Sequence, residues 1–142
     1  MNKVNGLDCI LLIEDDNAIN FMHKLAIKDL GIDAVVEVCM NGKEGLDYLT
    51  NNGKYVGNKE FPKPGLIFLD INMPLMNGWE FLDEYQNLPP EQKGNIIVAM
   101  VSASINPMDK KRAMENSQVS AFIPKPLDAG QIKAIIDENF KS

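Results

Sequence analysis

Short apolar runs alternate with helical patterns along the whole chain. The runs are continuous rather than alternating in polarity, which is typical of strands that helices cover on both faces. A regular alternation of strand and helix predicts βα units around a parallel sheet. We therefore expect an α/β fold whose five strands lie at 10–13, 35–39, 66–69, 96–101 and 121–123.

The segments between these runs carry helix signals. Asn106 followed by Pro107 predicts an N-cap and a first helical residue, so a helix should run from there towards Asn116. The segment 51–64 contains turn formers without periodicity and is expected to be a long surface loop. The first helix should end at Gly31 and bury one apolar stripe. That stripe consists of Ile19, Met22, Ala26 and Leu30.

Length and composition favour one compact domain. The chain has 142 residues, of which 45% are hydrophobic and 24% are charged, close to the average for globular domains. The sequence shows no internal repeat and no linker. We expect a single domain over residues 1–142, with a core from about 8 to 140 and no output domain.

Charge and hydropathy argue against two kinds of partner. The net charge is −6, and the basic residues are scattered apart from 110–112, so the chain lacks the basic patch of a nucleic-acid binder. No apolar stretch approaches the ~20 residues of a membrane span, and the N-terminus lacks the apolar core of a signal peptide. We expect a cytoplasmic protein that binds neither nucleic acid nor membranes.

The two cysteines and the single histidine are predicted to be structural. Cys9 and Cys39 border apolar runs and have neither a CxxC spacing nor a clustered histidine, so they should be buried, inert thiols. His23 falls in the first predicted helix without a second nucleophile or ligand nearby in sequence. We expect a structural or solvent-facing histidine rather than a catalytic one.

Polar and charged residues follow four of the predicted strands. Glu14 and Asp15 follow the first strand, Asp70 the third, Ser102 the fourth and Lys125 the fifth. In an open α/β sheet, ligands bind outside the carboxyl ends of the strands. We therefore expect these side chains to gather at one edge of the sheet.

Three carboxylates at one place repel each other unless a cation neutralises them or some remain protonated. Oxygen ligands without histidine or cysteine favour Mg²⁺, which shares its coordination shell with phosphate oxygens. A carboxylate beside such an ion and a lysine can attack a phosphoryl group in line. The cluster therefore predicts a magnesium-dependent site that forms an aspartyl phosphate.

Four stretches resemble one protein family closely. They are ILLIEDD at 10–16, LIFLDINMPLMNG at 66–78, VSA at 101–103 and FIPKPL at 122–127. Together they resemble the receiver domain of two-component response regulators, the CheY-like group, over essentially the whole chain. The resemblance implies a (βα)5 doubly wound, flavodoxin-like fold, with a parallel sheet in the order 2-1-3-4-5 and helices on both faces.

The resemblance implies roles for the acidic residues. Asp70 would be the phosphoacceptor and Asp15 a direct Mg²⁺ ligand, with Glu14 assisting, often through water. Together with Asp70 itself, the backbone carbonyl of Asn72 would complete the protein's share of the metal shell. Asp16 lies one residue beyond the acidic pair and is expected to be a solvated acid or a helix cap.

The resemblance also implies a set of switch residues. Ser102 would be the hydroxyl that moves to bond a phosphoryl oxygen, and Lys125 would pair with another. The Lys125–Pro126 peptide is typically cis in this family, so Pro126 is expected to be a cis-proline. Phe122 stands at the position of the switch aromatic, although phenylalanine has no hydroxyl to bond in the inward state.

Four further positions follow from the same comparison. Asn72 and Ser104 lie two residues beyond Asp70 and Ser102 and resemble the variable positions that tune self-dephosphorylation. Pro74 and Gly78 should fix a tight turn and allow a close backbone contact after the phosphoacceptor.

The chain departs from the family pattern in two places. No glycine occurs in ENSQVSAF after the fourth predicted helix, which we therefore expect to end at Asn116 or Ser117. The loop at 51–64 is longer than the minimal pattern and resembles that of small single-domain receivers partnered with phytochrome-type or hybrid sensor kinases.

The resulting hypothesis is a phosphoacceptor response regulator of a two-component or phosphorelay system. It would be a switch rather than an enzyme, with intrinsic autophosphorylation and self-dephosphorylation only. A sensor histidine kinase or a histidine phosphotransfer protein would donate to Asp70. A downstream protein would bind the face formed by the fourth helix, the fifth strand and the fifth helix.

Two alternatives use the same residues differently. A haloacid-dehalogenase-like phosphohydrolase also has a strand-end aspartate and Mg²⁺, but its usual second acid two residues later is here Asn72, and the chain has no cap domain. A pseudo-receiver would bind proteins constitutively, but the acids, Ser102 and Lys125 are all present.

Overall fold

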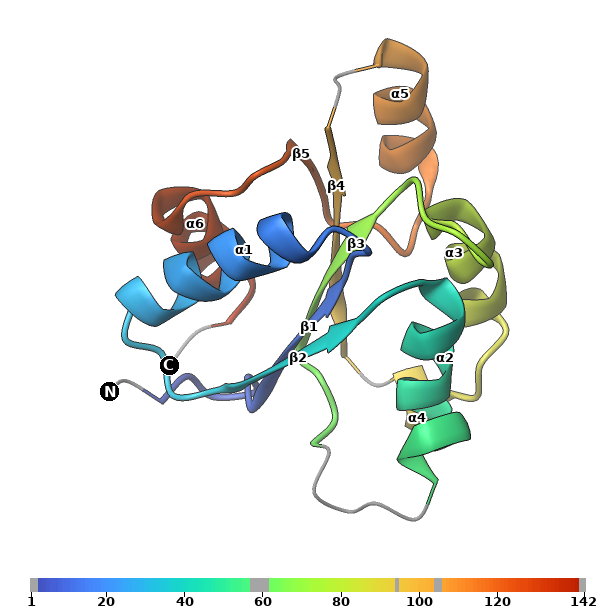
Figure 1. Ribbon diagram of the computed structural model, residues 1–142, viewed down its shortest axis with the longest axis horizontal. Helices are drawn as coiled ribbons and strands as arrows, with labels where there is room; N and C mark the ends of the chain where they lie inside the picture. Colours follow the sequence, from blue (N-terminus) through green and yellow to red (C-terminus); the bar gives the residue numbers. More distant parts are fainter. Residues whose placement is uncertain (1–2, 57–61, 94, 104–105, 141–142) are drawn as a thin grey trace.

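The computed structural model describes residues 3–56, 62–93, 95–103 and 106–140. Its five strands form one parallel sheet in the order β2-β1-β3-β4-β5 (Figure 1). The strands are β1 (Cys9–Ile13), β2 (Val35–Cys39), β3 (Leu66–Asp70), β4 (Ile97–Ser102) and β5 (Ala121–Pro124). The expected fold class and strand order are thus confirmed, with Asp70 and Ser102 forming the last residues of their strands.

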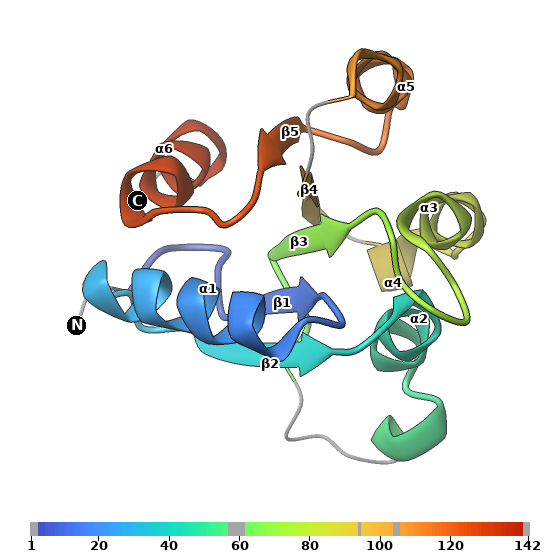
Figure 2. The same cartoon turned by 45° about the horizontal axis from the view of Figure 1, so that its top comes forward.

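The helices lie on both faces of the sheet, with α1 and α6 on one face and α2 and α3 on the other (Figure 2). Their bounds are α1 (Asn17–Asp29), α2 (Gly42–Thr50), α3 (Gly78–Gln86), α4 (Pro90–Lys93), α5 (Pro107–Glu115) and α6 (Ala129–Asn139), with a 3-10 turn η1 at Gly53–Tyr55. The fourth and fifth helices predicted from the sequence are therefore α5 and α6. The short helix α4 was not expected. None of the helices in the described ranges is long and apolar enough to cross a membrane.

The central strands are buried because each contributes side chains to two hydrophobic clusters. Leu11 and Ile13 point to the cluster under α2 and α3, whereas Ile10 and Leu12 point to the cluster under α1 and α6. Successive side chains of a strand alternate between the faces of a sheet, so a strand covered on both faces must be apolar at every position. This requirement explains the continuous apolar runs in the sequence.

The predicted stripe of α1 is wrong at Met22. The fully buried residues of this helix are Asn20, His23 and Ile27, whereas Met22 is 46% exposed. Each of the two buried polar side chains makes one hydrogen bond: the Asn20 amide donates to the Glu14 carbonyl, and His23 accepts from a backbone N–H. Apolar periodicity cannot detect a helix face that buries hydrogen-bonded polar groups.

The segment 51–64 is only partly the surface loop that the sequence predicted. Within it, Tyr55 of η1 is 2% exposed and packs edge-on against Tyr48 of α2, with ring centroids 4.9 Å apart. Residues 57–61 lie outside the described residues. One tyrosine among turn formers thus anchors the first half of this segment to the core, an arrangement that composition alone does not indicate.

The two cysteines are buried and unpaired, as expected. Cys9 and Cys39 are both 0% exposed, and their sulfur atoms lie 3.5 and 3.4 Å from the hydroxyl oxygens of Tyr48 and Tyr55. Burial raises the pKa of Cys9 to about 11 and that of Cys39 to about 12. Both thiols are therefore held in their neutral form.

Candidate functional site

The carboxyl edge of the sheet brings the predicted charged residues together. Lys125, just after β5, places its Nζ 2.7 Å from Glu14 Oε1 and 3.1 Å from Asp70 Oδ1. Glu14, Asp70 and Ser102 are buried, with 2%, 3% and 3% of their surface exposed, whereas Asp15 is exposed. The site is thus a largely desolvated ion cluster with one carboxylate reaching solvent.

Strand register explains why residues distant in sequence meet here. Ile13 of β1 pairs with Leu69 of β3, so the next residue on each strand, Glu14 and Asp70, emerges at the same level. The Glu14 N–H donates to the Cys39 carbonyl, 2.9 Å away, which extends the ladder to β2 by one residue. The backbone therefore fixes the acidic side chains before any ligand binds.

Asp16 completes this corner as a helix cap rather than as a member of the cluster. Its Oδ1 accepts hydrogen bonds from the N–H groups of Ala18 and Ile19, at 2.9 and 3.3 Å. Its own N–H donates to Glu14 Oε2 at 3.1 Å. Of the two roles expected for Asp16, the structure thus shows the helix cap, and the cap helps to orient Glu14.

The loop after Asp70 is held by two close backbone contacts. The Gly78 N–H donates to the Ile71 carbonyl at 2.8 Å, and a Cβ atom on Gly78 would lie 2.5 Å from the Asp70 carbonyl oxygen. The Gly42 N–H donates to the Met76 carbonyl at 3.0 Å, which ties the loop to the start of α2. The expected close contact at Gly78 is confirmed. Leu75, between these contacts, is 84% exposed with φ of 65°, a strained conformation for leucine.

Burial and mutual repulsion control the protonation of this cluster. Burial, with the neighbouring charge of Asp70, raises the pKa of Glu14 to about 7 even though Lys125 bonds to it. Burial also raises the pKa of Asp70, against the effect of Lys125. Burial opposes the charge of Lys125, but its bond to Glu14 and the charge of Asp70 outweigh this and raise its pKa. One ammonium therefore compensates two buried carboxylates incompletely.

The three carboxylates are arranged so that a bound cation could reduce the electrostatic repulsion among them. One oxygen from each of Glu14, Asp15 and Asp70 can be chosen so that all three lie within 4.8 Å of one another. The cluster has only oxygen donors, the set that hard divalent ions prefer. The acidic cluster could thus bind a metal ion.

The other predicted site residues lie around the ion cluster or outside the described residues. The Lys125–Pro126 peptide is cis, as expected. Phe122 pairs with Met100 across β4 and β5 and is half-buried against the cluster that contains Ala113. Asn72 is exposed beside the site, whereas Ser104 lies outside the described residues.

His23 is a supporting residue that the sequence did not reveal as such. Its Nε2 accepts a hydrogen bond from the Leu127 N–H at 3.0 Å, two residues beyond Lys125. The imidazole is 1% exposed, and burial, with the charge of Lys125, lowers its pKa to about 4. Neutral His23 thus helps to fix the backbone that carries Lys125. Its hydrogen bond joins α1 to the segment just before α6, and no local sequence pattern indicates such a contact.

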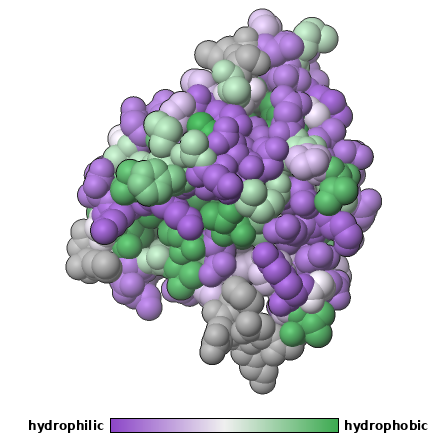
Figure 3. All heavy atoms as spheres, viewed as in Figure 1, coloured by the Kyte–Doolittle hydropathy of each residue, from purple (hydrophilic) through white to green (hydrophobic). Residues whose placement is uncertain are grey.

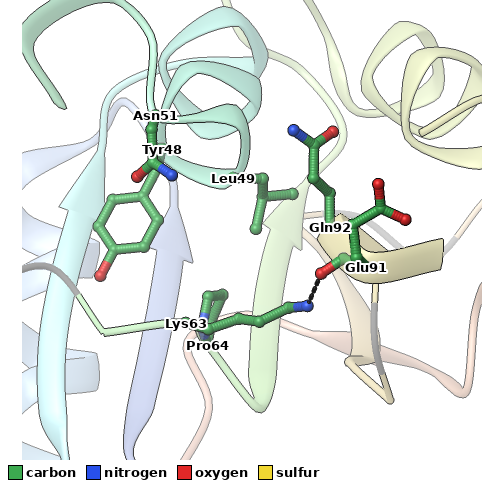
Figure 4. A pocket seen from close by; sticks show the side chains of 7 residues that line it. All are labelled: Tyr48, Leu49, Asn51, Lys63, Pro64, Glu91 and Gln92. Carbon is green, nitrogen blue, oxygen red and sulfur yellow. Dashed lines mark hydrogen bonds between the residues drawn. The ribbon is translucent and has the colours of Figure 1, made fainter. Parts of the chain in front are cut away.

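A small pocket lies away from this site, at the opposite end of the sheet (Figure 4). It adjoins Pro64, two residues before β3 begins, whereas Asp70 ends that strand. The Lys63 ammonium crosses it to donate to the backbone carbonyl of Glu91. The pocket is lined by Tyr48, Leu49, Asn51, Lys63, Pro64, Glu91 and Gln92. Its position separates it from the chemistry at Asp70.

Comparison with known proteins identifies the family. The response regulator receiver domain matches residues 10–137. The chain belongs to this family. It is therefore a phosphoacceptor receiver of two-component signal transduction, a class of domains that act as signalling switches rather than as classical enzymes. This assignment removes the haloacid-dehalogenase alternative.

Three relatives show how similar this chain is to known proteins. The probable methanogenesis regulatory protein FilR2 of Methanothrix harundinacea (strain 6Ac) is 30% identical over 129 residues, which cover 91% of this chain and 79% of FilR2. The crystal structure of the phosphorylated cyanobacterial phytochrome response regulator RcpA is 28% identical, covers 93% and 90% of the two chains and has a TM-score of 0.74. The Mn²⁺-bound form of Rcp1 from Synechocystis sp. is 27% identical, covers 92% and 90%, and has a TM-score of 0.72.

Proposed function

We propose that Asp70 is the phosphoacceptor of this receiver. The observation that carries the proposal is the position of its carboxylate, which is buried at the end of β3 and lies 3.1 Å from the Lys125 ammonium. One Asp70 oxygen attacks the phosphorus of a phosphohistidine, and an O–P bond forms as the P–N bond breaks. The released imidazole keeps the electron pair and takes up a proton, while Lys125 neutralises an oxygen of the transferred group.

We assign Mg²⁺ to Glu14, Asp15, Asp70 and the backbone carbonyl of Asn72. The all-oxygen donor set supports Mg²⁺, and Mn²⁺ in the Rcp1 structure shows that a related receiver accepts a divalent ion. A bound Mg²⁺ supplies positive charge to the carboxylates and to the phosphoryl oxygens. Cation binding should also lower the pKa of Glu14 and Asp70 again, because it removes their repulsion.

Ser102 and Phe122 are the proposed switch residues. Ser102 lies at the end of β4 and Phe122 on the adjacent strand β5, so a movement of the hydroxyl towards a phosphoryl group changes the packing space beside Phe122. The resulting output surface is the face of α5, β5 and α6, where a downstream protein binds. Asn72 and Ser104 would set the lifetime of the phosphoryl group by shaping the access of water.

The phosphoryl donor is proposed to be a sensor histidine kinase or a histidine phosphotransfer protein in the cytoplasm. A donor must approach the carboxyl edge, and α1, which begins there, exposes Phe21 by 64% and Leu25 by 46%. Hydrophobic side chains are visible among hydrophilic ones over this part of the surface (Figure 3). An apolar groove continues from Leu25 to Pro126 and Leu127, next to Lys125. We assign this surface to the donor.

Intact mass spectrometry tests the phosphoacceptor directly. Incubation with acetyl phosphate and Mg²⁺ should add one phosphoryl group to the wild-type protein and none to Asp70→Asn. Mg²⁺-dependent binding of beryllofluoride should distinguish a working receiver from a constitutive binding module. A wild-type protein that binds Mg²⁺ but gains no mass would contradict the proposal.

Phosphotransfer profiling against a panel of autophosphorylated histidine kinases tests the donor surface. The double variant Phe21→Ala, Leu25→Ala should accept phosphate more slowly from any kinase that phosphorylates the wild type. Its rate with acetyl phosphate should be unchanged, because a small donor does not need the surface. Equal loss with both donors would argue against docking and for damage to the fold.

A further inference from the structure

A cation–π contact joins α5 to α3. The Arg112 guanidinium carbon lies 4.2 Å from the centroid of the Trp79 ring. The two helices neighbour each other on the same side of the sheet in both ribbon views (Figures 1 and 2). Neither residue of this contact belongs to the ion cluster around Asp70.

Few other side chains hold α5 in place. Ala113 is its single fully buried residue, whereas Met108 and Met114 are 74% and 58% exposed. A helix with one small anchor depends strongly on each additional contact. The pair between Arg112 and Trp79 is therefore one of the side-chain contacts that restrain α5.

Trp79 is coupled to the backbone of Asp70. It follows Gly78, whose N–H donates to the Ile71 carbonyl and whose Cα approaches the Asp70 carbonyl so closely that a Cβ does not fit. A capping box between Asn77 and Glu80 fixes this first turn of α3 from both sides. The indole therefore projects from a turn that packs directly against the Asp70 backbone.

The other partner of the contact follows a different strand. Arg112 belongs to α5, which begins at Pro107, five residues beyond Ser102 at the end of β4. Arg112 and Trp79 therefore lie on helices that follow different strands, since α5 follows Ser102 and α3 follows Asp70. The contact between Arg112 and Trp79 joins these two helices, so a movement of one relative to the other would change the contact.

We propose that Arg112 is a positioning residue that holds α5 against Trp79 in the unmodified receiver and yields when Asp70 is phosphorylated. This proposal rests on the proposed function, because the movement of Ser102 is the response to the phosphoryl group. It adds a second response at the output face, the release of α5 from the start of α3, beside the route through Phe122.

Trp79 is the only tryptophan of the chain, so its fluorescence reports on this contact without labelling. The variants are Arg112→Ala, the conservative Arg112→Lys, and Lys111→Ala as a control that removes a neighbouring exposed charge from the same helix. Each is measured with Mg²⁺ alone and with Mg²⁺ plus beryllofluoride or acetyl phosphate. Hydrogen exchange of residues 107–115 is followed by mass spectrometry on the same samples.

In the unmodified state, we expect Arg112→Ala to change the Trp79 emission and to accelerate exchange in α5 by about two- to fivefold, the effect of losing one exposed cation–π contact. Arg112→Lys should restore part of both, and Lys111→Ala should match the wild type. Phosphorylation should accelerate exchange in wild-type α5 and should have a smaller additional effect in Arg112→Ala.

Two results would overturn the proposal. One is identical exchange and emission in unmodified Arg112→Ala and Lys111→Ala. The other is a phosphorylation-dependent change of the same size in Arg112→Ala and in the wild type, which would make the contact merely structural. The mass of each sample separates these results from a failure of phosphorylation, because a protein that gains no phosphoryl group contradicts the role of Asp70 instead.

Discussion

The burial of His23 makes the stability of this receiver depend on pH in a direction that one substitution can isolate. His23 is the only histidine of the chain, and its pKa falls from 6.5 to about 4 because it is buried and lies near the Lys125 charge. At about 1.36 kcal/mol per pKa unit, this difference corresponds to roughly 3 kcal/mol. The imidazole is 1% exposed, so solvent screens little of this effect.

The sign follows from which state binds the proton first. The folded pKa lies below the unfolded value, so His23 is unprotonated in both states above about pH 7 and contributes no pH dependence there. As the pH falls below 6.5, the unfolded chain takes up a proton that folded His23 does not. Stability contributed by this residue is therefore lost progressively between pH 6.5 and about 4.

Glu14 has the opposite effect over nearly the same range. Its folded pKa is raised from 4.5 to about 7, so its contribution to stability is full below pH 4.5 and is lost as the pH rises through 7. Asp70, whose pKa is also raised, acts in the same direction. The wild-type curve of stability against pH therefore combines opposing slopes, and a variant is needed to separate them.

The variant His23→Gln provides this separation, because glutamine does not titrate and its amide oxygen can still accept the Leu127 N–H. Urea unfolding in EDTA, followed by far-ultraviolet circular dichroism, gives the free energy of unfolding from pH 4.5 to 8. We expect the value for His23→Gln minus that for the wild type to rise by about 2–3 kcal/mol from pH 7.5 to 4.5. A difference that stays constant over this range would refute the reasoning. An NMR titration of the His23 ring that shows a midpoint near 6.5 would refute it as well.

Three further predictions follow from the described contacts. Gly78→Ala should lower the free energy of unfolding by about 1–3 kcal/mol in urea denaturation, because its Cβ would meet the Asp70 carbonyl. Gly130→Ala in α6 is the control, since its Cβ would meet only the Asp128 side chain at 3.4 Å. It should be neutral or stabilising by up to about 1 kcal/mol. Tyr55→Ala should cost about 3 kcal/mol in the same assay, since it removes a buried ring from between Tyr48 and the core; a surface-like effect below about 0.5 kcal/mol would contradict its anchoring role. Mg²⁺ should raise the melting temperature more at pH 8 than at pH 6, because a proton on Glu14, whose pKa is about 7, competes with the ion. An equal increase at the two pH values would mean that the ion does not bind at Glu14.

The parts of the structure that the sequence predicted depend on local patterns. Buried parallel strands need continuous apolar runs, so the runs that end at Ile13 and Leu69 are visible without any knowledge of the fold. The acidic residues beyond them reach one edge because parallel strands share a direction. The βα alternation and the strand ends are enough to predict that these acidic side chains gather at one edge. The order of the strands is predicted only by the family resemblance.

The parts that the sequence did not predict depend on pairings between distant segments. The sequence does not indicate whether His23 is buried or exposed, because its partner, the Leu127 N–H, is more than a hundred residues away. Tyr55 lies among turn formers, and its partners Tyr48 and Cys39 are on other elements. The contact between Arg112 and Trp79 is equally invisible, since an arginine on a polar helix has no pattern that indicates a ring beside it.

The environment of the two cysteines has a practical consequence for following the movement of α5. Maleimide dyes react with thiolates at accessible sites, and Cys9 and Cys39 are neither ionised at neutral pH nor exposed. A cysteine introduced at Met108 or Met114, both exposed on α5, would therefore be the reactive thiol in the native protein. A fluorophore attached there would act as an energy-transfer acceptor for the indole of Trp79, so the separation between α5 and α3 can be measured without replacing either native cysteine.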